Sequence, residues 1–409
     1  MATRPGVHRS TLAALMLCAF FGSATFTSVA PFLNEMAADF NRSIGVVGQL
    51  SSVSSLAAGF SALFLFSTID RLRPKLVLLI AVGGVGVATL ATGLLHWFPA
   101  LLAAQFVAGG CATTALTTTL VMLGRLAANP TERARRQGLL IGMGGCGPLA
   151  GTPLLRLVAD GADWRAAVLL YGAVALCGAL VVLLTLPNIA PLGGHGGGRV
   201  ADAVAAARMP LVGRTLVLSS LVWLIWGVLG SFLAGFAAHA YPGQGWVIGA
   251  LWTTDGISYM VGAFGSGLLI IWLGGAVRAV AVALVAGTAA VAGFGFLAIH
   301  PAFSLGMYFI YMGLLGVLNS GVVHLLHRFG RDRQGPVLFL SSAIGRAGTF
   351  AGGVLGGIVL ELAGFTGWAV LLVAGSTITL APLAALVHAE RRTVRRLTGQ
   401  PAEDRSLLA

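Results

Sequence analysis

Residues 76–96 read LVLLIAVGGVGVATLATGLLH and contain no Asp, Glu, Lys or Arg. A hydrocarbon layer about 30 Å thick needs roughly 20 apolar residues of helix to cross it, because a backbone exposed to lipid must satisfy its hydrogen bonds within its own segment. Segments of this kind recur along the whole chain. They predict twelve transmembrane helices, at approximately 11–32, 46–69, 76–96, 100–124, 138–157, 166–186, 214–238, 246–273, 279–299, 302–327, 336–360 and 367–388.

The composition agrees with a chain whose main solvent is lipid. Hydrophobic residues make up 57% of it, charged residues 9%, and the mean hydropathy is +0.91. The first apolar run has no small-residue cleavage site after a short core, so we interpret it as a first helix and not as a removed signal peptide. The fold class expected is an all-α membrane protein.

The arginines predict its orientation, because Lys and Arg near helix ends concentrate on the cytoplasmic side. With the N-terminus inside, 21 of the 25 basic residues are cytoplasmic. Both termini are then cytoplasmic, and the net charge of +12 needs no nucleic-acid partner. Arg outnumbers Lys 24 to 1, which, with the many Ala and Gly residues, suggests a GC-rich bacterial genome and hence an inner membrane.

Two halves are indicated by a linker and by a repeat. The glycine-rich run GGHGGG at 193–198 lies in the longest connection. The string VVGQL at 46–50 is similar to VIGAL at 247–251, and GPLAG at 147–151 is similar to GTFAG at 348–352, both at an offset of 201 residues. We expect an N-terminal six-helix bundle at 1–187, a cytoplasmic linker at 188–213, a C-terminal six-helix bundle at 214–390 and a cytoplasmic tail at 391–409. Such parallel repeats predict a substrate site between the halves near the midplane.

The chain resembles the major facilitator superfamily, and in particular its twelve-helix drug and metabolite proton antiporters. Asp70, Arg71, Arg73 and Lys75 resemble the family's loop signature between helices 2 and 3, which implies a clamp that holds the outward-facing state. The family's glycine four residues before the acid is replaced here by Phe66. The alternative is that these cations only enforce topology.

A second part of the resemblance is in helix 5, where Gly147, Pro148 and Gly151 are similar to the antiporter signature and imply export. Ordinary packing of small residues explains the glycines equally well. In helix 4 the family's arginine linked to proton transfer is replaced by Gln105, followed by Gly109 four residues later. Glutamine can hydrogen-bond a substrate but carries no charge, so any proton coupling must be arranged differently.

Two ionisable residues lie deep in apolar segments. Asp255 is nine residues into helix 8, roughly 14 Å, and Arg346 is ten residues into helix 11, roughly 15 Å from the opposite face. Trp252 and Tyr259 share the helical face of Asp255. We expect either that Asp255 takes up and releases the proton, or that Asp255 and Arg346 form a permanent ion pair that fixes helix packing.

Other cavity candidates follow helical spacing. Ser219, Trp223 and Trp226 are at i, i+4 and i+7 in helix 7, and Gln105, Gly109, Thr113 and Thr117 repeat every four residues in helix 4. Such mixed stripes could line a pocket, or could equally pack against lipid and neighbouring helices.

Three functions remain open at this point. The first is proton-driven export of a small organic molecule by alternating access, the second is import or facilitated diffusion of such a solute, and the third, least favoured, is a membrane receptor or scaffold. No nucleophile with a base, metal-ligand cluster or Walker-type loop is present in the sequence, so we expect neither an enzyme nor a cofactor or metal. We expect a monomer whose partners are its solute, protons and the lipid bilayer.

Overall fold

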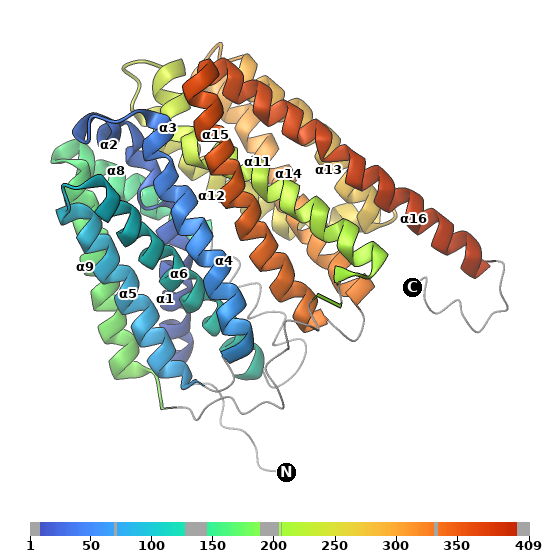
Figure 1. Ribbon diagram of the computed structural model, residues 1–409, viewed down its shortest axis with the longest axis horizontal. Coiled ribbons are helices and arrows are strands. Elements are labelled where there is room, and N and C mark those ends of the chain that lie inside the picture. Colours follow the sequence, from blue (N-terminus) through green and yellow to red (C-terminus); the bar gives the residue numbers. More distant parts are fainter. Residues whose placement is uncertain are drawn as a thin grey trace.

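The computed structural model describes residues 9–68, 72–126, 145–188, 204–205, 207–330 and 334–398. Every regular element in these residues is helical. Figure 1 shows two helical bundles side by side, with the N-terminal elements in one and the C-terminal elements in the other. The elements of the N-terminal half are α1 (Arg9–Ala24), η1 (Thr25–Thr27), η2 (Ala30–Phe32), α2 (Leu33–Asp39), α3 (Ile44–Val47), α4 (Gln49–Thr68), α5 (Pro74–Leu94), α6 (Phe98–Leu126), η4 (Gly147–Gly151), α8 (Thr152–Gly161) and α9 (Trp164–Thr185).

The C-terminal half has fewer and longer elements. These are α11 (Pro210–Ala240), α12 (Trp246–Trp272), α13 (Ala276–Phe296), α14 (Pro301–Gly330), α15 (Gln334–Ile378) and α16 (Leu380–Thr398). Element α15 contains two helices, because Gly364 has φ +61° and turns the chain back within it. The second helix of α15, after Gly364, continues into α16, which ends at Thr398. The segment from residue 391, predicted to be a tail, therefore begins as part of this helix.

The predicted count of twelve spans agrees with this architecture. Nine helices in the described residues are long and apolar enough to cross a membrane, and the last of these, Val337–Ala389, holds two spans on either side of Gly364. The shorter apolar helix Ser10–Ala24 and the η4–α8 segment occupy the first and fifth predicted positions. The chain is therefore a multi-pass helical membrane protein.

Three predicted helices differ in detail from the observed ones. The first ends at Ala24 and continues as two short 3-10 turns, where the Thr25 hydroxyl donates to the Phe21 carbonyl. The second is divided at Gly48. In the fifth, residues Gly147–Gly151 form a π-helical turn that includes Pro148, since proline supplies no backbone donor to an α-helical ladder. Most of the predicted linker, 189–203 and 206, lies outside the described residues.

Large apolar side chains cover the outside of the bundles. Leu184 is 74% exposed, Leu268 75% and Ile271 78%. Water would penalise such a surface, whereas lipid tails are as apolar as the side chains themselves. The exposed helix faces are therefore the lipid-facing ones.

Close backbone contact joins α12 to α14. A Cβ atom built on Gly262 would lie 2.9 Å from the Cα of Gly313, and one built on Gly316 would lie 2.7 Å from the backbone nitrogen of Ala263. Helices in lipid associate through such tight packing of small residues, because lipid tails are as apolar as the side chains and no hydrophobic driving force brings the helices together. This backbone contact sets the distance between α12 and α14. It therefore also sets the distance between side chains of the two helices that lie one to two helical turns from the glycines.

We predict that Gly262→Ala lowers the thermal stability of the detergent-solubilised protein. The added methyl group would force α12 away from α14, and overpacking of this kind costs about 1–3 kcal/mol. Gly265→Ala, on the same helix, is the matched control, because nothing lies within 4 Å of the position of its added Cβ. Equal melting temperatures for the two variants would contradict the proposed contact.

Candidate functional site

A cavity of about 320 Å³ lies between the two halves. The N-terminal half contributes residues of α1, η1, α6 and the η4 segment, and the C-terminal half contributes residues of α11, α12, α14 and α15. Its lining residues are Ser23, Phe26, Leu116, Leu120, Gly145, Pro148, Trp223, Trp226, Asp255, Gly256, Tyr259, Met312, Leu315 and Arg346.

Asp255 is the acidic residue of the cavity wall. Its side chain is on α12, is 6% exposed, and accepts a hydrogen bond of 2.8 Å from the hydroxyl of Tyr308 on α14. The backbone contact at Gly262 keeps these two helices at the distance that this bond needs. An acid held by a single neutral donor inside an apolar bundle is the kind of group that marks an ion or substrate pathway.

Arg346 faces the same cavity from α15. Its guanidinium carbon lies 4.0 Å from the centroid of the Phe26 ring, which belongs to η1 of the other half. A cation over an aromatic face is stabilised by the ring quadrupole. Within the described part of the chain no ion pair joins Arg346 to Asp255 in this conformation, and both roles expected for Asp255 stay predictions.

Aromatic side chains make up much of the remaining wall. Trp223 and Trp226 on α11 meet edge to face with their ring centroids 5.8 Å apart. The Tyr259 hydroxyl accepts a 2.7 Å hydrogen bond from the amide of Asn319. Flat apolar surfaces beside one acid and one cation suit an amphipathic organic molecule, with the rings supplying contact area and the charges orienting it.

Four of the predicted cavity residues do not line this cavity. Trp252 is 1% exposed and Ser219 and Thr113 are each 3% exposed. Thr117 is half-buried and also lies outside the lining. On α6 the lining residues are Leu116 and Leu120, so the cavity meets a different stripe of this helix from the polar one expected.

Gln105 is part of a hydrogen-bond network inside the N-terminal half and not of the cavity. It is 1% exposed, its amide nitrogen donates to the Thr92 hydroxyl at 3.1 Å, and its side-chain oxygen accepts from the Ser54 hydroxyl at 3.0 Å. These bonds connect α6 to α5 and α4. The stripe that begins at Gln105 packs against α4, since a Cβ atom on Gly109 would lie 2.6 Å from the Cα of Ser54.

The helix 5 motif lies where the halves meet. A Cβ atom on Gly147 would be 2.8 Å from the Cα of Ala24, and Pro148 lines the cavity. From the other half, a Cβ atom on Gly256 would be 2.7 Å from the carbonyl oxygen of Gly145. The glycines of this segment therefore permit close approach of α1 on one side and α12 on the other, while a Cβ atom on Gly151 would make an ordinary contact of 3.8 Å with the Phe20 ring.

Only part of the predicted gating loop can be placed. Asp70 and Arg71 lie outside the described residues. Arg73 is exposed at the residue before α5, and Lys75 is half-buried in the first turn of that helix. The clamp stays a prediction.

The cavity also contains residues that the sequence did not single out, among them Phe26, Leu116, Leu120, Met312 and Leu315. Apolar periodicity does not separate a face that borders a cavity from a face that borders lipid or another helix. Phe26 follows a break in the first helix that is seen in the structure and carries no comparable signal in the sequence.

Residues 15–331 match the sequence profile of the Major Facilitator Superfamily. No curated protein sequence matches the chain. The fold is similar to the crystal structure of a bacterial homologue of the human lysosomal transporter Spinster in an inward-facing and occupied conformation, with a TM-score of 0.71 and 17% identity over 95% of this chain and 98% of that one. It is also similar to a variant of the nucleoside transporter NupG, with a TM-score of 0.76 and 14% identity over 92% and 99% of the two chains.

We predict that Gln105→Leu lowers thermal stability and leaves transport unchanged. Interhelical hydrogen bonds in membrane proteins contribute about 0.6 kcal/mol each on average, so the expected loss is about 1 kcal/mol for the two bonds. Melting temperature and solute flux in proteoliposomes would be measured together. Loss of flux at wild-type stability would show instead that Gln105 acts in transport.

Proposed function

The chain belongs to the major facilitator superfamily, and we propose that it exports a small organic molecule in exchange for protons. Secondary transport of a small solute is the activity that this fold supports, and it makes the protein a transporter and not an enzyme. The direction of transport, the coupling ion and the class of solute go beyond what the fold supports and are proposed here. The observation that carries them is Asp255 in the wall of an aromatic cavity between the halves.

Exchange follows if solute and proton compete for this cavity. An ionised carboxylate is costly inside a membrane unless it is paired, so Asp255 without a bound cation is stabilised by taking up a proton. A cationic or strongly polar solute that reaches the cavity would favour the ionised carboxylate and release that proton. The hydrogen bond from Tyr308 orients the carboxyl group in both cases.

Arg346 supplies a contact that changes as the halves move. Its guanidinium group lies on the C-terminal half and the Phe26 ring on the N-terminal half, so rocking of one half against the other separates them. A freed guanidinium group attracts an acidic or hydrogen-bonding portion of the solute. We therefore propose an amphipathic solute with a positive group that binds near Asp255, an acidic or hydrogen-bonding group that binds Arg346, and an aromatic or apolar body.

Three hydrogen bonds between the halves support an arrangement that is closed on the outer side. Asn34 donates to the Ala234 carbonyl at 3.1 Å, the Gly45 backbone to Glu361 at 3.1 Å, and the Gln49 amide to the Gly353 carbonyl at 3.4 Å. All three lie toward the membrane side that carries α2 and α3, which Figure 1 places at the upper end of the molecule. By the arginine distribution this is the outer side.

We place the protein in a bacterial inner membrane as a monomer, with both termini in the cytoplasm and with halves at 1–187 and 214–390. Asp70, Arg71, Arg73 and Lys75 would form the cytoplasmic clamp after the inner ends close. Uptake of a solute is the competing function, because the same fold can work in either direction.

We predict that Asp255→Asn abolishes proton-driven accumulation and retains solute exchange. The amide fills the same volume and keeps the hydrogen-bond partner, but it cannot take up a proton. A compound identified by a thermal-shift screen of the purified protein would be used in proteoliposomes with an imposed pH gradient.

Asp163→Asn, at the outer end of α9, is the control and should leave both activities unchanged. Accumulation at the wild-type rate in Asp255→Asn would exclude the titrating role. Cells that lack the protein should become more sensitive to the compound or accumulate it, whereas loss of growth on the compound as a nutrient would indicate uptake.

A further inference from the structure

The short helix α2 lies at the outer end of the molecule between two sets of contacts. Glu35 and Asp39 are four residues apart and share one helical face. Both are paired with arginines of the N-terminal half. Asn34, on the same helix, is hydrogen-bonded to the C-terminal half. Helix α2 therefore links an arginine-bound surface on one half to a surface of the other.

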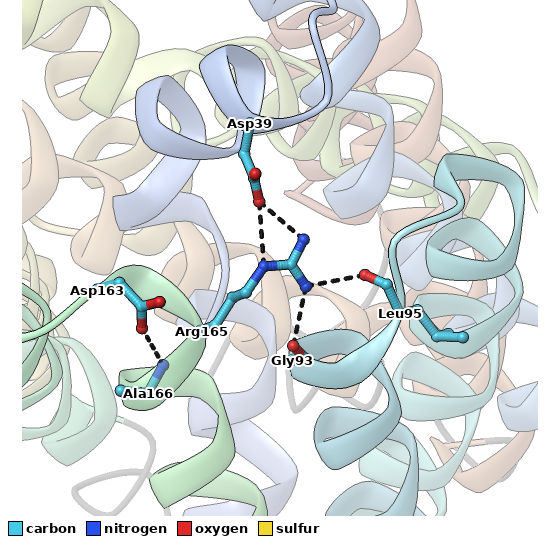
Figure 2. Close-up of polar contacts among 6 residues, drawn as sticks. All are labelled: Asp39, Gly93, Leu95, Asp163, Arg165 and Ala166. Atoms are coloured by element: carbon cyan, nitrogen blue, oxygen red, sulfur yellow. Dashed lines mark hydrogen bonds and ion pairs between the residues drawn. The ribbon is translucent and has the colours of Figure 1, made fainter.

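Arg165 attaches the end of α2 to α5 and α9 (Figure 2). Its Nη2 and Nε atoms donate to one carboxylate oxygen of Asp39 at 2.7 and 3.1 Å. Its Nη1 atom donates to the carbonyls of Gly93 and Leu95, each at 2.9 Å. The guanidinium carbon also lies 4.6 Å from the centroid of the Trp164 ring. One planar group thus holds three chain segments at fixed angles, which the single ammonium of lysine could not do.

Arg156, on α8, attaches the beginning of α2. Its guanidinium group pairs with Glu35 and, at 3.2 Å, with Asp160 of its own helix. It also donates to the Pro31 carbonyl at 3.3 Å, in the turn that leads into α2. Because Arg156 and Arg165 bind acids one helical turn apart, they prevent α2 from tilting or rotating on the N-terminal half.

The opposite side of this region meets the C-terminal half. The Asn34 amide donates to the Ala234 carbonyl of α11, and a Cβ atom on the next residue of α11, Gly235, would lie 3.0 Å from Ile44 and 3.5 Å from Leu33. Just beyond, Glu361 of α15 accepts a hydrogen bond from the Gly45 backbone. These contacts form only if α2 and α3 keep a fixed position relative to α11 and α15.

We propose that Arg156 and Arg165 are positioning residues for transport, which hold α2 rigidly on the N-terminal half so that it closes the outer side against α11 and α15. This rests on the transport function proposed above. The two arginines touch no solute. They act through α2, whose position decides whether the outer ends of the halves can meet.

Distances between spin labels test this without a solute or a proton gradient. The protein would be the full chain in lipid nanodiscs, with its four cysteines, Cys18, Cys111, Cys146 and Cys177, replaced by alanine. One label pair, at Ala38 and Leu184, reports the position of α2 on its own half. A second pair, at Leu94 and Leu362, reports the separation of the two halves at the outer side. The last three are exposed large side chains, and Ala38 is exposed on α2.

We expect Asp39→Asn and Arg165→Lys each to broaden the first distance distribution and to add a longer distance to the second. Asp39→Asn leaves the bonds of Arg165 to Gly93 and Leu95 in place, so it isolates the attachment of α2 from the packing of α5. Asp163→Asn is the matched control, because Asp163 caps α9 through the Ala166 backbone and does not contact α2 in the described structure.

Two outcomes would overturn the proposal. Unchanged Ala38–Leu184 distances in both variants, and in a Glu35→Gln, Asp39→Asn double variant that also removes the ion pair with Arg156, would show that α2 is held without the arginines. Broadened distances in that pair with an unchanged Leu94–Leu362 distance would show that α2 takes no part in outer closure. Neither depends on Asp255, so failure of proton-coupled export would leave this test intact.

Discussion

The structure depends on the absence of water around its backbone. In hydrocarbon every peptide group must bond within its own helix, so the chain can vary only in where its helices break and in how closely they approach. Breaks at Ala24, Gly48, η4 and Gly364 and close contacts at Gly147, Gly256 and Gly262 are where this variation is concentrated. The cavity lies beside several of these breaks and close contacts, where η1 carries Phe26, η4 carries Pro148 and α12 carries Asp255.

The sequence could predict the features that stand out against an apolar background. Twelve segments of sufficient length and an uneven distribution of arginine predict a polytopic helical protein, and Asp255 and Arg346 are conspicuous because charged residues are rare inside such segments. Both do border the cavity, together with Tyr259, Trp223 and Trp226. The resemblance of residues 147–151 to a family motif located the segment that packs at the interface of the halves.

What could not be predicted is which face each helix turns toward its neighbours. Gln105 was expected in the substrate pathway, yet Ser54 and Thr92 satisfy its amide within one half. A polar residue in a membrane helix has two ways to avoid lipid, a solvated cavity or a neighbouring hydroxyl, and a single sequence does not distinguish them. The acids Glu35, Asp39 and Glu361 carry no signal in the sequence, because charged residues at helix ends are readily solvated, whereas in the structure all three are bound to distant parts of the chain.

The π-helical turn at Gly147–Gly151 sets the register between the two parts of the fifth membrane helix. The Thr152 amide bonds to the carbonyl of Gly147, five residues earlier, where an α-helix would use four. Converting this turn to α-helical spacing would rotate α8 by about 100° relative to the residues before it. Arg156 would then move around the helix axis, so a one-residue shift beside the cavity would change the contacts of Arg156 at the end of the bundle that carries α2.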